Sequence, residues 1–490
     1  MLIPPKFIVE LKNSGHFQPF RYPITTPKRT PFSLYMITSK LHHPRTTTTL
    51  LYSLSSHRVH AIHPHPRGIA SSLFPFLRGT SHSPLSVQST HPTRPSVTAM
   101  ATPSQTQTQP AGAPNVRTAL EEVETKTGAF IRKESAFRNF IVQGDSSSRF
   151  QPEPNRYHLY VSLACPWANR CVATLYMKGL QDVIGLSITH PTWQRTRPND
   201  ANDTHTGWVF ASPEDPPFKN SAGYGSFGCQ GCIPDTVNGA KFVRDLYELA
   251  DDTSGKYSVP VLWDKKEKTI VNNESAEIMR MFNSAFNDYA KHPEIDLFPE
   301  HLAGEIEEVN AWVYPSINNG VYRCGFATSQ EAYDVAFGYV FFTVFFNFFR
   351  STHTHSPIYT HTHTYSELFS ALDKAEEILT KRRYIAGDVL TEADIRLFMT
   401  LIRFDPVYVV YFKTDKKCIR EYPALREYVR DMYSTPGVKE SINITHIKTH
   451  YFTSHPRLNA YAIIPNGPEP WWEEDHNRYK MTHQSVAFEV

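Results

Sequence analysis

Hydrophobic and polar positions repeat with two different periods between residues 150 and 283. The run 156–162 is rich in β-forming residues, and 166–178 then repeats apolar positions along one helical face, with a proline in its first turn and Gly179 after its end. A second β-forming run spans 182–190. A strand, a helix and a strand at this spacing predict a βαβ unit with two parallel strands.

The same region continues with a second helix and two further strands. Residues 240–250 predict a helix, "YSVPVLWDKKEKTIVNNES" predicts two short strands joined by a charged turn, and 275–282 begins another helix. The order β-α-β-α-β-β-α predicts a thioredoxin-like domain. Pro260 stands where a strand enters this sheet, which fits an edge strand or a cis peptide bond.

From about residue 300 the apolar positions repeat almost entirely with the helical period. Helices are predicted over 301–314, over 329–336 resuming at 366–380, over 391–403 and over 421–433. Thr391 and Asp394 fit a capping box at the start of one of them. The predicted fold class is therefore an α/β thioredoxin-like N-terminal domain plus an all-α C-terminal domain, with the binding cleft between them.

Composition separates both ends of the chain from this core. Residues 1–100 contain one acidic residue, Glu10, among many Ser, Thr, Pro, His and Arg residues, which is typical of an organelle transit peptide. We expect a chloroplast protein, with a mitochondrial or cytoplasmic location as alternatives, and an over-long gene model is the other explanation of this segment. The predicted parts are a transit peptide over 1–100, a linker and N-terminal extension over 101–150, a thioredoxin-like domain over 151–290, a helical domain over 300–450 and a C-terminal extension over 451–490.

An unusual segment interrupts the helical part at 337–364. An aromatic run, "FGYVFFTVFFNFF", is followed by histidines that alternate with threonine. A metal-binding tract is one interpretation. We favour an aberrant insert, because this segment matches neither flank, and the flanks read as parts of one amphipathic helix. The aromatic run is also shorter than the ~20 apolar residues that cross a bilayer, so we predict no membrane span.

Charge and cysteine content restrict the function classes. A net charge of +2 over 490 residues argues against dedicated nucleic-acid binding. Contents of 40% hydrophobic and 20% charged residues are typical of a globular protein. Six cysteines in this length do not make a secreted disulfide scaffold, so a thiol is free to react.

The stretch "YVSLACPWANRC" places Cys165 at the start of a predicted helix. Free N–H groups and the positive end of the helix dipole stabilise a thiolate there, which predicts a lowered pKa and a nucleophile; a buried capping residue is the alternative. Ala168 occupies the position where a dithiol oxidoreductase has its second cysteine, and Cys171 points away, about 240° around the helix. A mixed disulfide on Cys165 therefore needs an external thiol, and glutathione is the abundant candidate.

Cys229 and Cys232 form a Cys-x-x-Cys pair in a glycine-rich loop. A zinc site would need two more ligands, and no second pair at usable spacing is evident in the sequence. We therefore predict a disulfide or an unreactive loop, and no metal cofactor. Cys324 and Cys418 have no motif around them and are expected to be packing residues.

Several long blocks resemble the glutathionyl-hydroquinone reductases, the Omega-like Xi class of the glutathione transferase family. The blocks are "RYHLYVSLACPWANR", "VPVLWDKKEKTIVNNESAEIMRMFN", "AWVYPSINNGVY", "GFATSQEAYD", "LTEADIRLFMTLIRFDPVYVVYFK" and "HIKTHYFTSH". They follow one another over about residues 150–480. The resemblance implies a glutathione transferase fold, a homodimer and glutathione as co-substrate.

The resemblance also implies roles for individual residues. Cys165 is the expected catalytic thiol. The expected glutathione contacts are Glu274 and Ser275 at the glutamyl end, with Ser275 also able to cap its helix, the backbone of Val259, Trp208 over the peptide and Lys256 at a carboxylate. The expected hydroquinone contacts are Tyr314, Tyr408 and Tyr411, and the expected catalytic tyrosines among them are Tyr314 and Tyr408. Helix capping and core packing are the alternative roles of these side chains.

The reaction that the resemblance implies is the reduction of a glutathionyl-hydroquinone. The Cys165 thiolate attacks the glutathione sulfur, the hydroquinone leaves with a proton, and a second glutathione resolves the mixed disulfide, which predicts ping-pong kinetics. An Omega-like thiol transferase or dehydroascorbate reductase with the same cysteine is one alternative. A non-catalytic ligand-binding protein with a glutathione transferase fold is the other.

Overall fold

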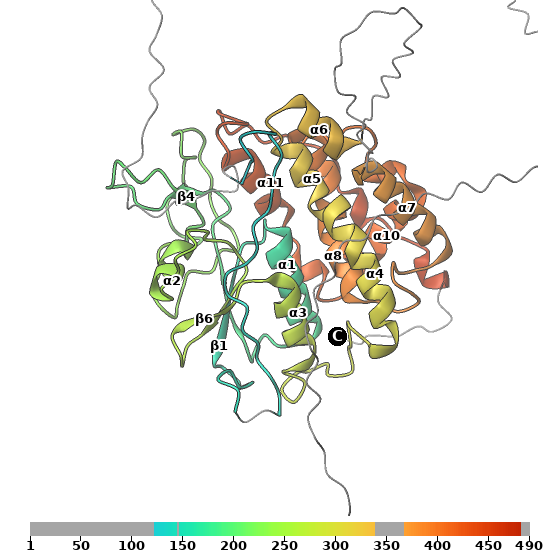
Figure 1. Ribbon diagram of the computed structural model, residues 1–490, viewed down its shortest axis with the longest axis horizontal. Coiled ribbons are helices and arrows are strands. Elements are labelled where there is room, and N and C mark those ends of the chain that lie inside the picture. The colour runs from blue at the N-terminus through green and yellow to red at the C-terminus, as the bar shows by residue number, and fades with distance from the viewer. Residues whose placement is uncertain (1–121, 145–146, 339–366, 482–490) are drawn as a thin grey trace, which may run out of the picture. The chain divides into compact units, whose positions relative to one another are not determined.

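The computed structural model describes residues 122–144, 147–338 and 367–481 (Figure 1). The transit peptide predicted over 1–100 and nearly all of the insert predicted over 337–364 lie outside these residues. Of the described helices, none is long and apolar enough to cross a membrane.

A four-stranded mixed sheet forms the centre of the first region, with the strand order β2-β1-β5-β6. Strand β1 runs parallel to β2 and antiparallel to β5, and β5 runs antiparallel to β6. The strands are β1 (Tyr157–Val161), β2 (Gly185–Ile188), β5 (Val261–Asp264) and β6 (Thr269–Asn272). All of β1 and β5 is buried, as expected of inner strands that are covered on both faces.

Three helices cover this sheet: α1 (Pro166–Met177), α2 (Val243–Leu249) and α3 (Ser275–Ser284). Figure 1 shows α1 and α3 between the sheet and the helical region, and α2 on the opposite side. The predicted parallel βαβ unit and the thioredoxin-like order are confirmed. The long segment between β2 and α2 adds a small hairpin of β3 (Gln194–Arg195) and β4 (Thr206–Gly207).

The peptide bond between Val259 and Pro260 is cis. It leads into β5, which lies between β1 and β6. The edge-strand explanation of this proline is therefore wrong, and the cis explanation is confirmed.

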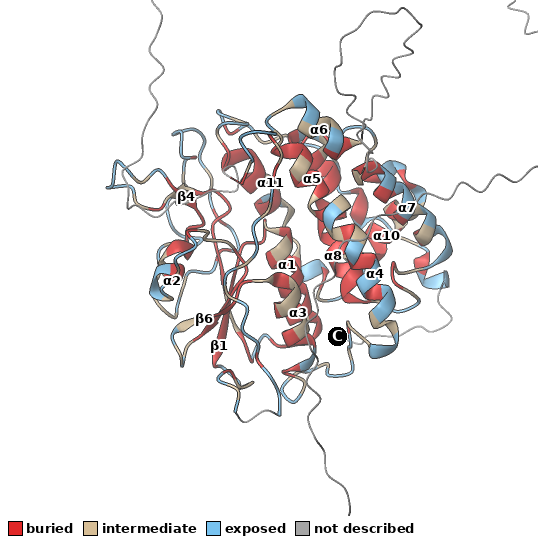
Figure 2. Cartoon of the chain, in the orientation of Figure 1, coloured by how far each residue is buried: buried red, intermediate tan, exposed pale blue. Residues whose placement is uncertain are grey.

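The second region consists of helices. They are α4 (Ala303–Val313), α5 (Gly320–Gly325), α6 (Gln330–Phe337), α7 (Glu367–Lys381), α8 (Glu392–Arg403), α9 (Val409–Tyr411), α10 (Pro423–Ser434) and α11 (Ile444–Thr453). Short 3-10 turns lie at Glu300–Leu302, Ile419–Glu421, Lys439–Ser441, Trp471–Glu473 and Arg478–Met481. Every residue of α8 is buried, so α8 is the central helix (Figure 2). Its capping box of Thr391 and Asp394 is present as predicted, and the predicted fold class is confirmed.

Two of the long helices contain a π-helical turn that includes a proline. Tyr314–Asn318 joins α4 to α5, and Phe404–Tyr408 joins α8 to α9. A proline lacks the N–H group that continues the α-helical ladder, and a widened turn accommodates this loss without ending the helix. The first turn carries Tyr314, which lines the cleft described below.

The single helix predicted over 329–336 and 366–380 is in fact two helices. Helix α6 ends at Gly338, whose φ of 108° gives a left-handed C-cap. Helix α7 packs against α6, and the ring centroids of Phe337 and Phe369 lie 5.0 Å apart. Both helices are amphipathic, so the pattern alone did not distinguish one continuous helix from two that pack side by side.

Residues 122–144 pack onto the protein and are not a free linker. Phe130 and Ile141 are buried in the core. The backbone N–H of Asn273 donates to the carbonyl oxygen of Phe137 at 3.1 Å, next to the end of β6. The N-terminal segment is therefore part of the structure that surrounds the cleft.

The C-terminal extension predicted from residue 451 begins inside α11. Beyond that helix, Trp471 and Trp472 are buried, and Arg430 Nε of α10 donates to the carbonyl oxygen of Trp471 at 2.9 Å. The boundary at 450/451 therefore divides a continuous packed unit.

Candidate active site

A cleft with a volume of about 680 Å³ lies where the sheet region meets the helical region. The predicted site residues that line it are Cys165, Trp208, Lys256, Val259, Glu274, Ser275 and Tyr314. Further lining residues, which the sequence did not identify, are Arg132, Trp167, Tyr322, His450, Tyr451 and His455. Seven of the nine predicted side chains are thus brought to one place, and Tyr408 and Tyr411 are not.

Cys165 is the N-cap residue of α1 and is half-buried. Its Sγ lies 3.6 Å from the carbonyl oxygen of Val259, on the loop that enters β5. Cys171 is buried further along α1, and its Sγ lies 3.6 Å from the carbonyl oxygen of Ser275. Both thiols are free. The predictions that Cys165 begins the helix and has no local partner are confirmed.

Burial raises the pKa of the Cys165 thiol above its ordinary value. The backbone N–H groups of Ala168 and Trp167 and the charges of Arg403 and Arg132 act in the opposite direction. The predicted low pKa is therefore wrong. The helix N-terminus stabilises the thiolate, but the loss of hydration on burial destabilises it more. The thiolate is the minor form at neutral pH, and its share rises with pH.

Arg403, at the end of α8, is fully buried and reaches the loop that precedes Cys165. Its Nε donates to the carbonyl oxygen of Ala164 at 3.1 Å, its Nη2 donates to that of Leu163 at 3.2 Å, and it also bonds the side chain of Asn169. These described partners are all neutral, and a buried cation without a counter-charge costs several kcal/mol. A thiolate on Cys165 lowers that cost.

Arg132 brings a second positive charge to the cleft from the N-terminal segment. Its guanidinium carbon lies 3.9 Å from the ring centroid of Trp167, two residues after Cys165. Its Nε donates to Oδ1 of Asn319 at 3.1 Å. The predicted linker and N-terminal extension therefore supplies a site residue.

The start of α3 forms another part of the cleft wall. Glu274 is the N-cap, and its Oε1 accepts a hydrogen bond from the N–H of Ala276 at 3.3 Å. Ser135 Oγ donates to Oε2 of Glu274 at 3.0 Å. Ser275 is buried, with Arg170 Nη1 3.5 Å from its Oγ. Glu274 therefore caps this helix in place of Ser275, and the helix N-terminus favours an anionic ligand group.

Lys256 is already paired within the protein. Its Nζ lies 2.6 Å from Oε1 of Glu122 and donates to the carbonyl oxygen of Lys133 at 2.8 Å. Burial lowers the pKa of Lys256, and the neighbouring Glu122 acts in the opposite direction. A ligand carboxylate that binds Lys256 must share it with Glu122 or replace Glu122.

Trp208 follows β4 and stacks on His450 of α11, with ring centroids 4.4 Å apart and an angle of 29° between the ring planes. Trp193 contacts Trp208 edge-on at 5.4 Å. Burial lowers the pKa of His450 well below its ordinary value, so its ring is neutral at pH 7. These rings form an uncharged aromatic wall.

Three tyrosines form a hydrogen-bonded group next to His450, whose ring centroid lies 5.2 Å from that of Tyr451. The hydroxyls of Tyr322 and Tyr451 are hydrogen-bonded to each other, and that of Tyr451 lies 3.1 Å from that of Tyr408. Burial raises the pKa of all three phenols. They are therefore protonated at neutral pH and can donate hydrogen bonds or a proton.

The structure does not place Tyr408 and Tyr411, the other two predicted hydroquinone contacts, in the cleft lining. Tyr408 is fully buried behind two lining residues: its hydroxyl lies 3.1 Å from that of Tyr451, and its ring centroid lies 6.2 Å from that of Tyr322. The hydroxyl of Tyr411 lies 3.1 Å from Nδ1 of His455, and its ring packs in the core. All three phenols that were predicted lie at helix positions with similar sequence context, so only the packed structure separates Tyr314, which lines the cleft, from the other two.

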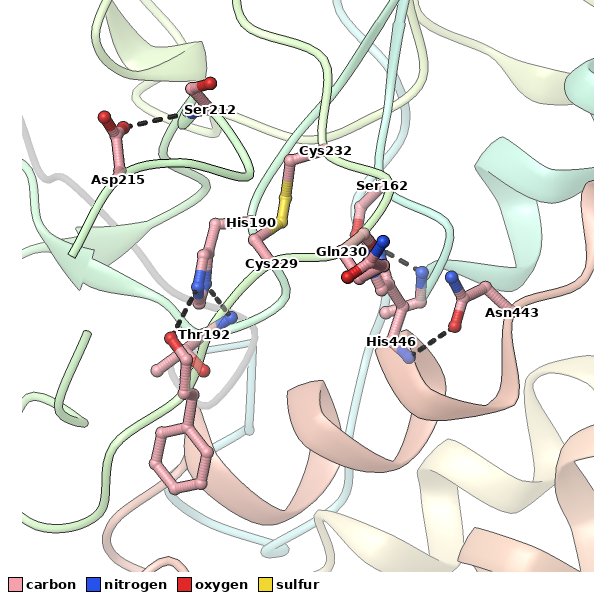
Figure 3. Close-up of a disulfide and its surroundings, with 12 residues drawn as sticks. Ser162, His190, Thr192, Ser212, Asp215, Cys229, Gln230, Cys232, Asn443 and His446 are labelled. Carbon is pink, nitrogen blue, oxygen red and sulfur yellow. Dashed lines mark hydrogen bonds between the residues drawn. A yellow bond between two sulfur atoms is a disulfide. The ribbon is translucent and has the colours of Figure 1, made fainter. Parts of the chain in front are cut away.

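Cys229 and Cys232 lie outside the cleft lining and form a disulfide, with their Cα atoms 5.5 Å apart (Figure 3). The disulfide predicted as one of two alternatives is therefore confirmed. Cys324 is a buried packing residue as expected, and Cys418 is half-buried.

Models of two protein domains match the chain. The glutathione S-transferase N-terminal domain matches residues 164–285, and the glutathione S-transferase C-terminal domain matches residues 360–431. The chain is 40% identical over 363 residues to glutathionyl-hydroquinone reductase YqjG of Escherichia coli, covering 73% of this chain and 94% of that protein. It is 39% identical over 353 residues to glutathionyl-hydroquinone reductase PcpF of Sphingobium chlorophenolicum, covering 72% and 94%.

Solved structures show the same similarity. The glutathione-bound structure of YqjG matches with 40% identity and a TM-score of 0.57, over 70% of this chain and 96% of that one. The glutathione S-transferase Xi of Phanerochaete chrysosporium matches with 41% identity and a TM-score of 0.57, over 70% and 98%.

Proposed function

Because the chain belongs to the glutathionyl-hydroquinone reductases, the Xi class of glutathione transferases, we propose that it reduces glutathionyl-hydroquinones with glutathione. Cys165 is the nucleophile in this proposal. The observation that supports it most is a single free thiol at a helix N-terminus within a cleft, with Ala168 where a dithiol enzyme has its second cysteine.

The first half-reaction forms a mixed disulfide. The Cys165 thiolate attacks the sulfur of the glutathionyl-hydroquinone, the carbon–sulfur bond breaks, and the hydroquinone carbon takes up a proton. Tyr451 and Tyr322 line the cleft as protonated phenols, so they are the proton donors we favour, with Tyr408 replenishing Tyr451 through its hydrogen bond. Tyr314 is the remaining phenol in the lining and is assigned to the hydroquinone ring.

The second half-reaction restores the enzyme. The thiolate of a second glutathione attacks the mixed disulfide, releases glutathione disulfide and leaves Cys165 as a thiolate. One hydroquinone and one glutathione disulfide therefore form for each substrate molecule and each glutathione consumed. The other thiol of α1, Cys171, is buried against the start of α3 and does not take this role.

The glutathione itself is assigned to the wall opposite the phenols. Its glutamyl carboxylate is placed at the N-terminus of α3 beside Glu274 and Ser275, where free N–H groups favour an anion. The backbone of Val259 pairs with the cysteinyl unit, which brings the glutathione sulfur close to Cys165.

Two further side chains are assigned to glutathione. Trp208 covers the peptide, and Lys256 replaces its ion pair with Glu122 by one with a glutathione carboxylate.

The test is an assay of the purified full chain with glutathionyl-menadiol and, separately, with dehydroascorbate. We expect menadiol and glutathione disulfide in equal amounts, ping-pong kinetics, and a glutathione adduct on Cys165 when the second glutathione is withheld. Cys418→Ser is the matched control, because Cys418 is a half-buried free thiol outside the cleft lining. Full turnover by Cys165→Ser, or turnover of dehydroascorbate alone, contradicts the proposal.

The proposal extends to assembly and location. We assign a homodimer because the family implies it, and import into the chloroplast because residues 1–100 contain a single acidic residue. Light scattering of the purified protein tests the first, and a monomer at micromolar concentration contradicts it. Fusion of residues 1–100 to a fluorescent protein tests the second, and cytosolic fluorescence contradicts it.

A further inference from the structure

Three side chains that can bind a metal ion meet beside α11, outside the cleft lining. Both sulfur atoms of the Cys229–Cys232 pair and a ring nitrogen of His446 lie within 4.8 Å of one another. The exposed fractions of Cys229, Cys232 and His446 are 5%, 4% and 2%, so the group is buried with a small opening to solvent. None of the three lines the cleft.

Two regular elements fix the positions of these residues: strand β2 anchors the cysteine loop, and helix α11 carries His446. Ile233, next to Cys232, exchanges two backbone hydrogen bonds with Ile188 at the edge of the sheet, with distances of 2.9 and 3.0 Å. His446 stands in the first turn of α11, and its N–H donates to the capping side chain of Asn443 at 2.9 Å (Figure 3). The cysteine loop and the imidazole are therefore each anchored to a regular element.

The state of His446 is set by its hydrogen bonds. Its Nε2 lies 2.7 Å from the carbonyl oxygen of Gln230, which can only accept, so Nε2 carries the proton. Nδ1 is then a lone-pair donor, and it is buried with no hydrogen-bond partner among the described residues. An imidazole anchored through its N–H to a backbone carbonyl, with the other nitrogen unused, is typical of metal-ligating histidines.

We propose that reduction of the Cys229–Cys232 disulfide converts this group into a Zn²⁺ site. The ligands are the two thiolates and His446 Nδ1, and a water molecule completes the tetrahedron. A dithiol reductant supplies two electrons and two protons to the disulfide and becomes a disulfide itself; Zn²⁺ then displaces the two thiol protons.

The ligand set favours zinc over other common ions. Two thiolates and an imidazole are soft or borderline ligands, whereas Mg²⁺ and Ca²⁺ prefer oxygen ligands, and the cluster as described contains no carboxylate. Zinc–sulfur bonds of about 2.3 Å place tetrahedral ligand atoms about 3.8 Å apart. Reduction must therefore separate the two sulfur atoms from the bonded distance of about 2.05 Å to this spacing. The imidazole is already close enough, since one of its nitrogens lies within 4.8 Å of both sulfurs.

The site also has a structural link to the cleft. His446 precedes His450 by one turn of α11, and His450 stacks on Trp208 in the cleft wall. Zinc would therefore attach the cysteine loop to the same helix that forms the aromatic wall of the proposed glutathione site.

The experiment uses the full chain with Cys165→Ser, which removes the cleft thiol as a metal ligand. The protein is reduced, freed of reductant without air, and titrated with Co²⁺ and then Zn²⁺. We expect one Co²⁺ per chain with a sulfur-to-cobalt charge-transfer band, which Zn²⁺ abolishes. This band reports thiolate ligands only, so any Co²⁺ bound by the histidines of residues 353–363 would not produce it. The oxidised protein should show no band.

Single substitutions locate the ligands. Cys232→Ser should remove the band, and His446→Ala should weaken Zn²⁺ binding at least ~100-fold, since even loss of a supporting contact costs about 10- to 100-fold. Cys418→Ser is the control and should bind normally. Independently of any variant, Zn²⁺ should slow the modification of two thiols per reduced chain by a thiol reagent. A reduced protein without the band, or a band that survives Cys232→Ser, overturns the proposal and leaves a purely structural disulfide.

Discussion

The two regions that carry reactive sulfur differ in what lies next to the sulfur atoms. Cys165 stands at the N-terminus of α1 and opens into a cleft, with backbone N–H groups and two arginines as its electrostatic environment. Cys229 and Cys232 lie on a loop and form a disulfide. His446 of α11 places a ring nitrogen within 4.8 Å of both sulfur atoms. A thiol that lines a cleft can exchange with an external thiol. Two buried cysteines beside each other can instead form a disulfide or bind a metal ion.

The difference shows that Cys-x-x-Cys spacing by itself does not identify the reactive site. The pair with redox-motif spacing lies outside the cleft lining, and the cysteine without a partner lines it. What distinguishes them is access to substrate and the position of the thiol at a helix terminus. The predictions below test this contrast, beginning with the largest effect.

Cys165→Ser should lower turnover of glutathionyl-menadiol by on the order of 10³-fold or more, because it removes the only nucleophile that the proposal assigns. The matched variant is Cys229→Ser with Cys232→Ser, which should stay within about threefold of the unmodified protein. Steady-state kinetics measures both. Comparable losses of turnover in the two variants would contradict the assignment of Cys165, and not Cys229 or Cys232, as the catalytic thiol.

Tyr451→Phe should lower kcat about 100-fold, since a positioned proton donor typically contributes ~10²-fold or more. Tyr411→Phe is the control: Tyr411 lies outside the cleft lining and its hydroxyl contacts His455, so the change should cost about 1 kcal/mol of stability and leave kcat unchanged. Activity assays and thermal unfolding separate the two effects. Equal kcat values for the two variants would contradict the proposed donor.

The pH profile should reflect the environment of Cys165. Burial raises the pKa of this thiol and attack requires the thiolate, so kcat/KM should rise with pH through the alkaline range. Arg132→Met removes a charge that lowers this pKa, so the profile should move to higher pH, with activity about threefold lower at pH 7 and recovered at high pH. Arg132→Lys keeps the charge and should move the profile less. A loss that is equal at every pH would indicate a packing role for Arg132.

Reduction of Cys229–Cys232 should have the smallest effect. The disulfide closes a loop of four residues, so its loss should cost about 2 kcal/mol of stability by the chain-entropy relation. Zinc should restore about 2.7 kcal/mol when its concentration is 100 times its dissociation constant. Thermal unfolding of the reduced protein with zinc and with a chelator measures both. An unfolding temperature that does not respond to zinc would contradict the metal site.

Local patterns predicted the elements of the fold well. The parallel βαβ unit, the helix that starts at Cys165 and the capping box of Thr391 and Asp394 all follow from interactions within a few residues of the chain. The same reasoning was wrong for the pKa of Cys165, because the dipole of one helix is local and desolvation is not. The same reasoning predicted one helix where the structure has α6 and α7. Hydrophobic periodicity shows that both segments are amphipathic helices, but it does not show whether the second continues the axis of the first.

The sequence by itself determined the fold class, the lone thiol at a helix start and the family resemblance. Tertiary structure alone decided which side chains surround that thiol, because Arg403 reaches the loop before Cys165 across 239 residues of chain. It also decided that Tyr411 belongs to the core, and that His446 meets the cysteine loop across 216 residues. Spacing rules extend over a few turns of chain, whereas a site is assembled by packing between distant elements.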